Sequence, residues 1–140
     1  MMAVENQASV ALGARDYAAI AAFRYQLRRF LAFSEAAAAA VGLPPQQHQA
    51  LLAMAGRGAP VSVGWLAEQL LIAPHTATEL AARMVEAGLV TKTASAADRR
   101  RMDLVPTGHA QDLLNRLTGA HLEELKTLEP ALVSALGGGS

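Results

Sequence analysis

Apolar residues recur every three or four positions along most of this chain, the spacing that places them on one face of an α-helix. The first such stripe, over residues 15–41, consists of Tyr17, Ile20, Phe23, Leu27, Phe30 and Leu31. A shorter stripe over residues 46–57 consists of Ala50, Leu51 and Met54. The last stripe follows Thr107, a possible helix cap, and consists of Ala110, Leu113, Leu114, Leu117, His121, Leu125 and Leu128. Pro130 is expected to end or kink this last helix because it lacks an amide hydrogen.

Residues 61–107, between these stripes, have the pattern of two short helices and a hairpin. Ser62 can cap the first short helix, in which Leu66, Ala67, Leu70 and Leu71 fall at helical spacing. Pro74 breaks that helix and suits the first position of the next, whose inward side is formed by Ala77, Leu80, Ala81 and Met84. Gly88 stops the second helix, and residues 89–93 then pair with residues 101–105. The pattern predicts a mainly α-helical chain with a small β-wing, the winged helix-turn-helix shape that fits a DNA groove.

The two long helices at the ends of the sequence carry more apolar surface than the segment between them can cover. All three phenylalanines lie in the first of these helices. This aromatic surface must be buried, whether in the same subunit or against a partner. We therefore expect the two ends to pack together and against a second copy of the chain.

Composition narrows the choice of function classes. The chain has 140 residues, no net charge and no cysteine, which excludes disulfides, cysteine-based zinc sites and thiol redox switches. It has no secretory signal and no apolar run of ~20 residues, so we expect a cytoplasmic protein. The four histidines show neither HxxxH nor HExxH spacing, so neither a metal nor another cofactor is expected.

Charge is distributed unevenly along this neutral chain. Between Arg83 and Arg101 there are five basic residues and only two acidic ones, including three adjacent arginines at the predicted hairpin tip. Taken alone, such a run is more often a solvated loop. Beside a helix-turn-helix it favours a basic wing that contacts nucleic acid.

The segment resembles the DNA-binding lobe of the MarR family, the multiple-antibiotic-resistance type of bacterial repressor. The residues that carry the resemblance are Leu66-Ala67, Thr78, Arg83, Gly88-Leu89-Val90, Lys92, Asp98-Arg99-Arg100 and Thr107, with Leu43 and Gln47 upstream. The similarity covers roughly residues 15–130. It implies a single MarR-like domain over 1–140, with 15–42 and 107–136 as dimerisation helices and 43–106 as the winged lobe. It also implies a two-fold dimer.

The candidate DNA contacts lie on the second short helix and on the wing. They are His75, Thr76, Thr78, Glu79, Arg83, Lys92, Asp98, Arg99, Arg100 and Arg101. Short polar side chains at the amino end of the helix can reach base edges in the major groove, and Arg83 is either a phosphate contact or part of an internal pair. The resemblance implies that Asp98 steadies Arg100 in the minor groove, which leaves Arg99 and Arg101 for backbone phosphates.

The chain departs from the family pattern at several of these positions. Ala73 stands where the family usually has an aspartate or similar cap for the recognition helix, and Glu79 and Ala82 replace residues that are often basic or polar and acidic, respectively. A carboxylate facing DNA repels phosphate but can accept a hydrogen bond from cytosine. Ala96 and Pro106 replace a common proline and leucine around the wing, so the sequence does not define the conformation of this loop.

The resemblance implies that a small, often phenolic or aromatic-acid ligand binds between body and lobe. The ligand candidates are aromatic, histidine or flexible apolar residues near that junction: Tyr17, Phe30, His48, Leu52, Met54 and Trp65. Each has a simpler structural alternative. His48 and His121 suit buried packing positions as well as a ligand contact, and Trp65 suits inter-helix packing as well as stacking on a ligand.

The sequence therefore predicts a homodimeric bacterial transcriptional regulator, a repressor released from a pseudo-palindromic operator by a small, possibly aromatic ligand. The alternative is a winged-helix module that binds another protein and not DNA, which the neutral charge and Glu79 keep open. An enzyme has the least support, because the chain has no nucleophile elbow, P-loop or dinucleotide-binding turn.

Overall fold

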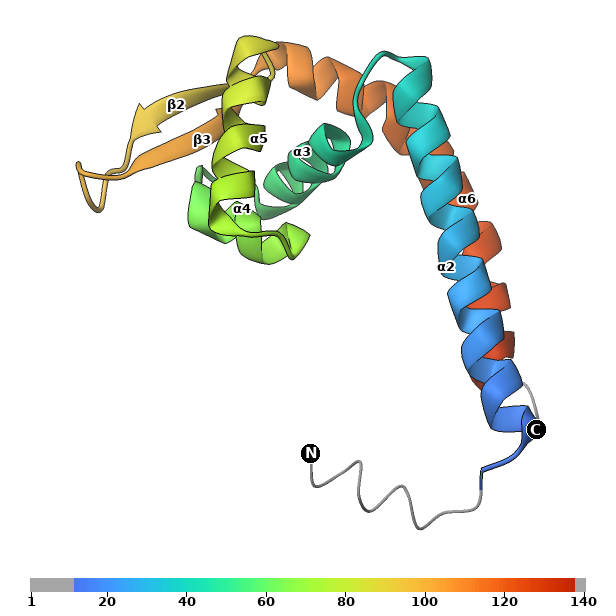
Figure 1. The fold of residues 1–140 in the computed structure, drawn as a ribbon. Helices are drawn as coiled ribbons and strands as arrows, with labels where there is room; N and C mark the ends of the chain where they lie inside the picture. Colours follow the sequence, from blue (N-terminus) through green and yellow to red (C-terminus); the bar gives the residue numbers. More distant parts are fainter. Residues whose placement is uncertain (1–11, 138–140) are drawn as a thin grey trace. The chain divides into compact units, whose positions relative to one another are not determined.

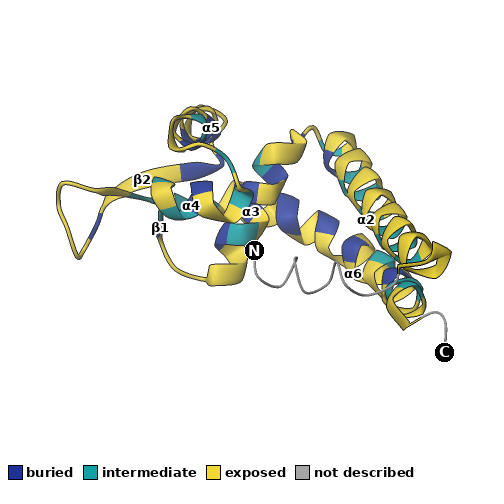
Figure 2. Ribbon diagram, turned by 60° about the horizontal axis from the view of Figure 1, so that its bottom comes forward, coloured by how far each residue is buried: buried dark blue, intermediate teal, exposed yellow. Residues whose placement is uncertain are grey.

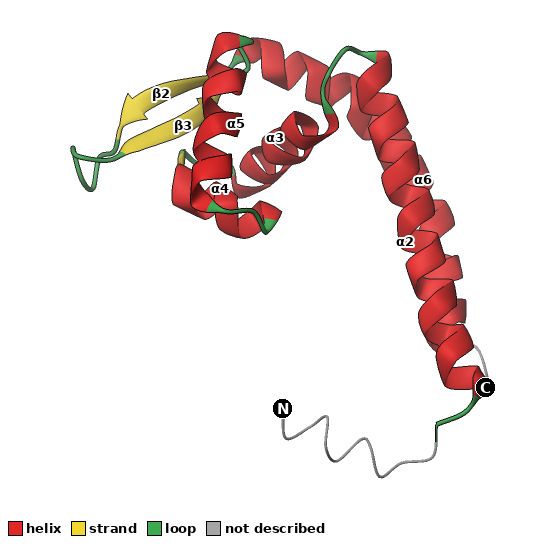
Figure 3. Ribbon diagram, in the orientation of Figure 1, coloured by secondary structure: helices red, strands yellow, loops and turns green. Residues whose placement is uncertain are grey.

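The computed structural model describes residues 12–137, which form five helices and three strands with the chain order shown in Figures 1 and 3, the first helix there being α2. The helices are α2 (Ala14–Ala40), α3 (Pro45–Arg57), α4 (Val63–Leu70), α5 (Pro74–Glu86) and α6 (Gly108–Gly137). The strands are β1 (Val61–Ser62), β2 (Val90–Ala94) and β3 (Met102–Pro106). The predicted fold class, mainly helical with a small β-wing, is confirmed.

The five helices and three strands of the described residues form two compact units. The terminal unit consists of the described residues up to Phe33 and those from Leu122 onwards. The winged unit consists of residues 34–121. Helices α2 and α6 contribute residues to both units, and within the terminal unit they lie side by side (Figure 1).

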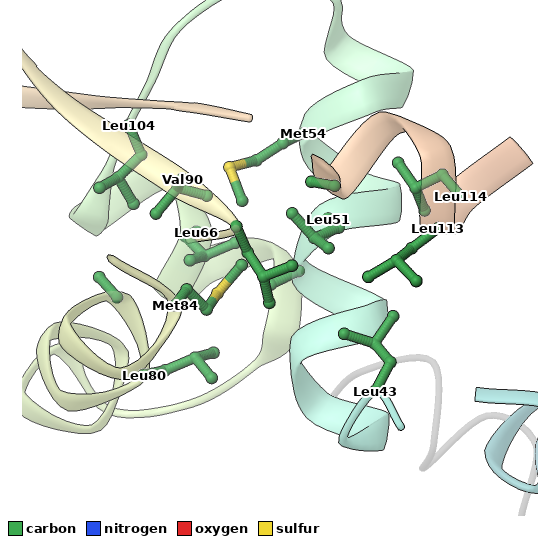
Figure 4. Packing of buried hydrophobic residues seen from close by; sticks show 14 of the residues in the cluster. Leu43, Leu51, Met54, Leu66, Leu80, Met84, Val90, Leu104, Leu113 and Leu114 are labelled. Carbon is green, nitrogen blue, oxygen red and sulfur yellow. The ribbon is translucent and has the colours of Figure 1, made fainter. Parts of the chain in front are cut away.

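The winged unit has a closed hydrophobic core. Its largest fully buried side chains are Leu51, Met54, Leu66, Met84, Leu104, Val61 and Val90. Figure 4 shows Leu51, Leu66 and Met84 converging from α3, α4 and α5. The inward positions predicted for α3 and α5 are all buried, so both stripes are confirmed.

A three-stranded antiparallel sheet covers one side of this core, in the order β1-β3-β2. The sequence predicts only the β2–β3 hairpin, and it places both strands one residue too early. The observed register pairs Val90 with Pro106 and Ala94 with Met102. The third strand was missed because β1 contains two residues, Val61 and Ser62, which are too few to show an alternating pattern.

The helix starts follow the predicted caps. Ser62 Oγ accepts a hydrogen bond from the Trp65 amide at 3.0 Å, and Pro74 occupies the first turn of α5. Thr107 Oγ1 accepts one from the Ala110 amide at 3.2 Å in the first turn of α6. These contacts satisfy amides that have no partner within their own helix.

Leu71 was predicted to continue the apolar stripe of α4, and this prediction is wrong. Helix α4 ends at Leu70, and Leu71 adopts a left-handed conformation (φ 56°) with 92% of its surface exposed. The following residue, Ile72, packs against the core instead, and its amide donates to the Ala67 carbonyl at 3.0 Å. The chain turns here to begin α5, so helical spacing no longer determines which side chains face inward.

Two expectations for α6 also need correction. The helix continues through Pro130 to Gly137, so this proline does not end it. Leu125, which was placed on the buried stripe, is 43% exposed, whereas the other six members of that stripe are buried.

The terminal unit leaves a large apolar surface uncovered, as the exposed positions along α2 in Figure 2 illustrate. On α2, four members of the predicted stripe are exposed: Tyr17 (64%), Ile20 (62%), Leu31 (50%) and Leu27 (38%). The three phenylalanines are half-buried. On α6, Val133 and Leu136 are exposed as well. No helix within residues 12–137 combines the length and apolar character needed to cross a bilayer.

Candidate nucleic-acid interface

Helix α5 presents a polar face opposite its buried one. His75, Thr78, Glu79 and Arg83 are exposed, as predicted, while Thr76 is half-buried. Thr78 Oγ1 donates to the Pro74 carbonyl at 3.1 Å, so its hydroxyl hydrogen is engaged by its own helix. Because the opposite side is anchored in the core, this polar face is held rigidly at the surface.

The amino end of α5 is open. Its N-cap residue is Ala73, which offers no side-chain hydrogen bond, and Pro74 contributes no amide hydrogen. The free amides and the positive end of the helix dipole at such a terminus favour a negatively charged group. The absence of a capping carboxylate at Ala73 therefore leaves this end available to a phosphate.

The β2–β3 hairpin projects beyond α4 and α5 (Figure 1). Ser95, which is 4% exposed, organises its tip: its Oγ accepts from the amides of Ala97 (3.2 Å) and Asp98 (3.3 Å). The Ser95 amide donates to the Arg101 carbonyl at 2.9 Å. Ser95 is not among the predicted site residues, although serine is a common turn residue because its hydroxyl can bond to the backbone just ahead of it.

The structure brings Asp98 and Arg100 together. Asp98 Oδ1 accepts from the Arg100 amide at 3.0 Å and lies 3.6 Å from Arg100 Nε. The Arg100 side chain is 94% exposed, so it stands at the tip with its guanidinium in solvent. Arg99 and Lys92 are exposed on the same hairpin.

Arg83 has no ion-pair partner within residues 12–137. Of the two roles considered for it, an internal pair and a phosphate contact, the internal pair is therefore not observed. Its place in the last turn of α5 leaves the guanidinium exposed beside the polar face of that helix.

A second arginine and aspartate lie close together where β3 leaves the tip of the hairpin. Arg101 Nε is 4.0 Å from Asp103 Oδ1. This oxygen is buried and has no hydrogen-bond partner. Asp103 was not among the predicted site residues, because a single acidic residue within a short strand carries no signal of its surroundings.

Two buried histidines pack together in the winged unit. The rings of His48 and His121 are 5.0 Å apart, edge to face. His121 Nδ1 donates to the Leu117 carbonyl at 2.8 Å, because a carbonyl can only accept, and Nε2 is hydrogen-bonded to Ser34 Oγ at 2.8 Å. Burial, and secondarily the neighbouring His121, lower the pKa of His48 below 6.5. Both histidines thus occupy buried packing positions, the structural alternative to a ligand contact.

The six ligand candidates are divided between the two units. Tyr17 and Phe30 belong to the terminal unit, and the other four belong to the winged unit. Met54 is 1% exposed within the core, and Trp65 is half-buried with the Arg57 guanidinium 5.3 Å from its ring centroid. A hollow of about 810 Å³ in the terminal unit is lined by neither Tyr17 nor Phe30. The ligand set stays a prediction.

The fold and this site define a winged helix-turn-helix protein. Residues 41–101 match the sequence profile of the MarR family. The resemblance to the MarR family seen in the sequence is therefore confirmed for this segment.

Solved structures of MarR-type proteins share the fold at low sequence identity. AbsC, a MarR family transcriptional regulator from Streptomyces coelicolor, is 18% identical with a TM-score of 0.72, over 85% of this chain and 81% of AbsC. A mutant of MepR from S. aureus bound to an oligodeoxyribonucleotide is 18% identical with a TM-score of 0.63, over 77% of this chain and 79% of MepR.

A third similar structure is BpsR from Bordetella bronchiseptica, whose DNA binding is described as regulated by 6-hydroxynicotinic acid. It is 18% identical with a TM-score of 0.61, over 75% of this chain and 74% of BpsR. No curated protein matches the chain in sequence.

Proposed function

We propose that this protein is a homodimeric transcriptional regulator that binds duplex DNA through two winged units. The observation that carries the proposal is the arrangement of α5 and the wing: an uncapped helix terminus and an exposed polar helix face stand beside a hairpin whose tip displays Arg100. Helix α5 would enter the major groove by its amino-terminal half. Arg100 would enter the minor groove, and Arg99, Arg101 and the first amides of α5 would contact phosphates.

The neutral net charge means that this attraction to DNA must be local. Affinity should therefore depend on a few phosphate contacts and fall as salt increases, with a slope set by their number. Glu79 on the exposed face of α5 opposes phosphate and favours a cytosine amino group, so it would contribute to base preference more than to affinity.

The apolar surface of the terminal unit supports a second copy as the partner. Tyr17, Ile20 and Leu31 on α2 are each at least half exposed in a single chain. Contiguous exposed apolar surface of this kind marks an interaction site. A two-fold dimer would set two recognition helices roughly 34 Å apart along the DNA, which corresponds to a pseudo-palindromic operator.

A small aromatic ligand would act by favouring one separation of the two winged units over another. Only a ligand that binds the two arrangements with different affinity can shift their populations. The similar BpsR supports this class of effector, since its DNA binding is described as regulated by 6-hydroxynicotinic acid. Repression, relieved by such a ligand, is the form of regulation that we propose.

The test is binding of the full chain to a labelled fragment of its own upstream DNA at two salt concentrations. We expect a steep loss of affinity at the higher salt. Arg100→Ala should weaken binding by about tenfold, in the range of one charge-assisted contact. Arg116→Ala removes an exposed arginine from α6 and serves as the matched control.

Unchanged affinity of the Arg100→Ala variant at moderate salt would refute the role of the wing. Absence of binding even at low salt would refute the function itself. The second candidate, a module that binds another protein, would then be favoured, on the strength of the neutral net charge and the exposed Glu79.

A further inference from the structure

The hairpin contains two arginine–aspartate pairs that differ in exposure. In the Asp98–Arg100 pair, the aspartate side chain is 49% exposed and the arginine 94%. In the Arg101–Asp103 pair, the aspartate is 14% exposed and the arginine 57%. Exposed ion pairs are weakened by water and salt, whereas a buried carboxylate attracts its partner more strongly. Asp103 is therefore better suited than Asp98 to hold an arginine side chain in one orientation.

The position of Asp103 follows from the sheet. On β3, Leu104 faces the core and pairs with Val61, so Asp103 points to the opposite face, where it is paired with Ser62 and Thr93. Arg101 lies two residues earlier along the chain. Side chains two positions apart in an extended chain share a face, which brings the guanidinium over the carboxylate.

The contact between them is incomplete. Asp103 Oδ1 is buried and lacks a hydrogen bond, and Arg101 Nε, at 4.0 Å, is too distant to provide one. A buried unsatisfied oxygen is unusual enough to require an explanation. Moving the guanidinium about 1 Å closer would turn the contact into a charge-assisted hydrogen bond.

We propose that Asp103 is a positioning residue for DNA binding, which holds Arg101 so that its guanidinium bridges the carboxylate and a backbone phosphate. A guanidinium has five N–H donors in a rigid fork, so a contact through Nε leaves the terminal nitrogens for a second acceptor. Phosphate binding then closes the contact with Asp103. This inference rests on the proposed DNA-binding function and adds to it a residue that the family resemblance did not supply.

Positioning of Arg101 and simple charge repulsion predict opposite effects of Asp103 on DNA affinity. If Asp103 only repelled phosphate, replacing it with neutral asparagine would tighten DNA binding. If it positions Arg101, Asp103→Asn should weaken binding by about threefold or more and lower the salt slope by up to about 0.9, the value of one phosphate contact.

The experiment measures anisotropy of a labelled duplex that the unmodified chain binds, over a series of salt concentrations. The variants are Asp103→Asn, Arg101→Ala and the double variant, with Asp112→Asn as a control that removes an exposed acidic residue from α6. Arg101→Ala should weaken binding about fivefold, and adding Asp103→Asn should cause no further loss. Arg101→Lys should resemble Arg101→Ala, because an ammonium lacks the planar fork.

Tighter binding by Asp103→Asn would overturn the proposal, and so would an equal loss with and without Arg101. Should Asp103→Asn fail to fold, Arg101→Lys decides alone, and full affinity in that variant would overturn the bridging geometry. A chain that binds no duplex overturns the proposed function and this inference together. Binding by the unmodified chain with a contrary result for Asp103→Asn overturns only this inference.

Discussion

The winged unit and the terminal unit differ in how far one chain completes them. The winged unit closes a core around Leu51, Leu66 and Met84, each of which is at most 1% exposed. In the terminal unit, α2 and α6 leave Tyr17 and Ile20 more than 60% exposed. Under the proposed function, each chain would complete its own DNA-binding unit, while the apolar surface of the terminal unit would be covered by a second copy.

The largest effect is expected in the core of the winged unit, where two adjacent leucines of α3 offer a matched pair. Leu51 is fully buried and Leu52 is 51% exposed. Leu51→Ala should lower the free energy of unfolding by about 2–5 kcal/mol, because it leaves a cavity as well as removing apolar contacts. Leu52→Ala should cost less than about 1 kcal/mol. Urea denaturation measures both, and equal losses would contradict a core that is closed on α3.

The next effect concerns the terminal unit. Ile20→Glu places a charge on the exposed apolar surface of α2, so it should weaken self-association by about tenfold or more, about 1.4 kcal/mol. Sedimentation over a range of concentrations measures the change. Ala21→Glu, on the neighbouring exposed position, is the control for added charge. An unmodified chain that remains monomeric at micromolar concentration would show that the surface is not a self-association site.

The smallest effect is a pH dependence within the winged unit. The pKa of His48 is lowered by burial and by His121, so below pH 6.5 the unfolded chain binds a proton that the folded chain does not. Stability is therefore complete above pH 6.5 and decreases as the pH falls toward the lowered pKa, by at most about 1.4 kcal/mol per pH unit for one group. Denaturation at pH 7 and pH 5.5 measures this loss.

His48→Gln should reduce that pH dependence, whereas His75→Gln, at an exposed position of α5, should leave it in place. A stability that rises between pH 7 and pH 5.5 would contradict the assignment, since it would require a group whose pKa is raised by folding.

Much of the winged unit could be predicted from the sequence because its signals are local. Pro74 at the start of α5 and the stripe ending at Met84 both depend on residues within one element. Leu71 was misplaced because spacing alone does not mark where a helix ends, and no glycine signals the left-handed turn there.

The parts that could not be predicted depend on contacts between distant residues. The hydrogen bond between Ser34 and His121 joins two helices far apart in sequence, and no short pattern encodes it. Asp103 is a similar case, because its burial depends on a neighbouring strand of only two residues and on the side chain of Arg101.

The hydroxyl of Thr107 has a consequence for how motion spreads within the winged unit. Its hydrogen is donated to the Gly88 carbonyl at 2.6 Å, while its oxygen accepts from the Ala110 amide at 3.2 Å. The Thr107 amide adds a bond to the Leu89 carbonyl at 3.0 Å. Thr107 thus links the segment that follows α5 to the first turn of α6. A displacement of α6 at this point would therefore move α5 with it.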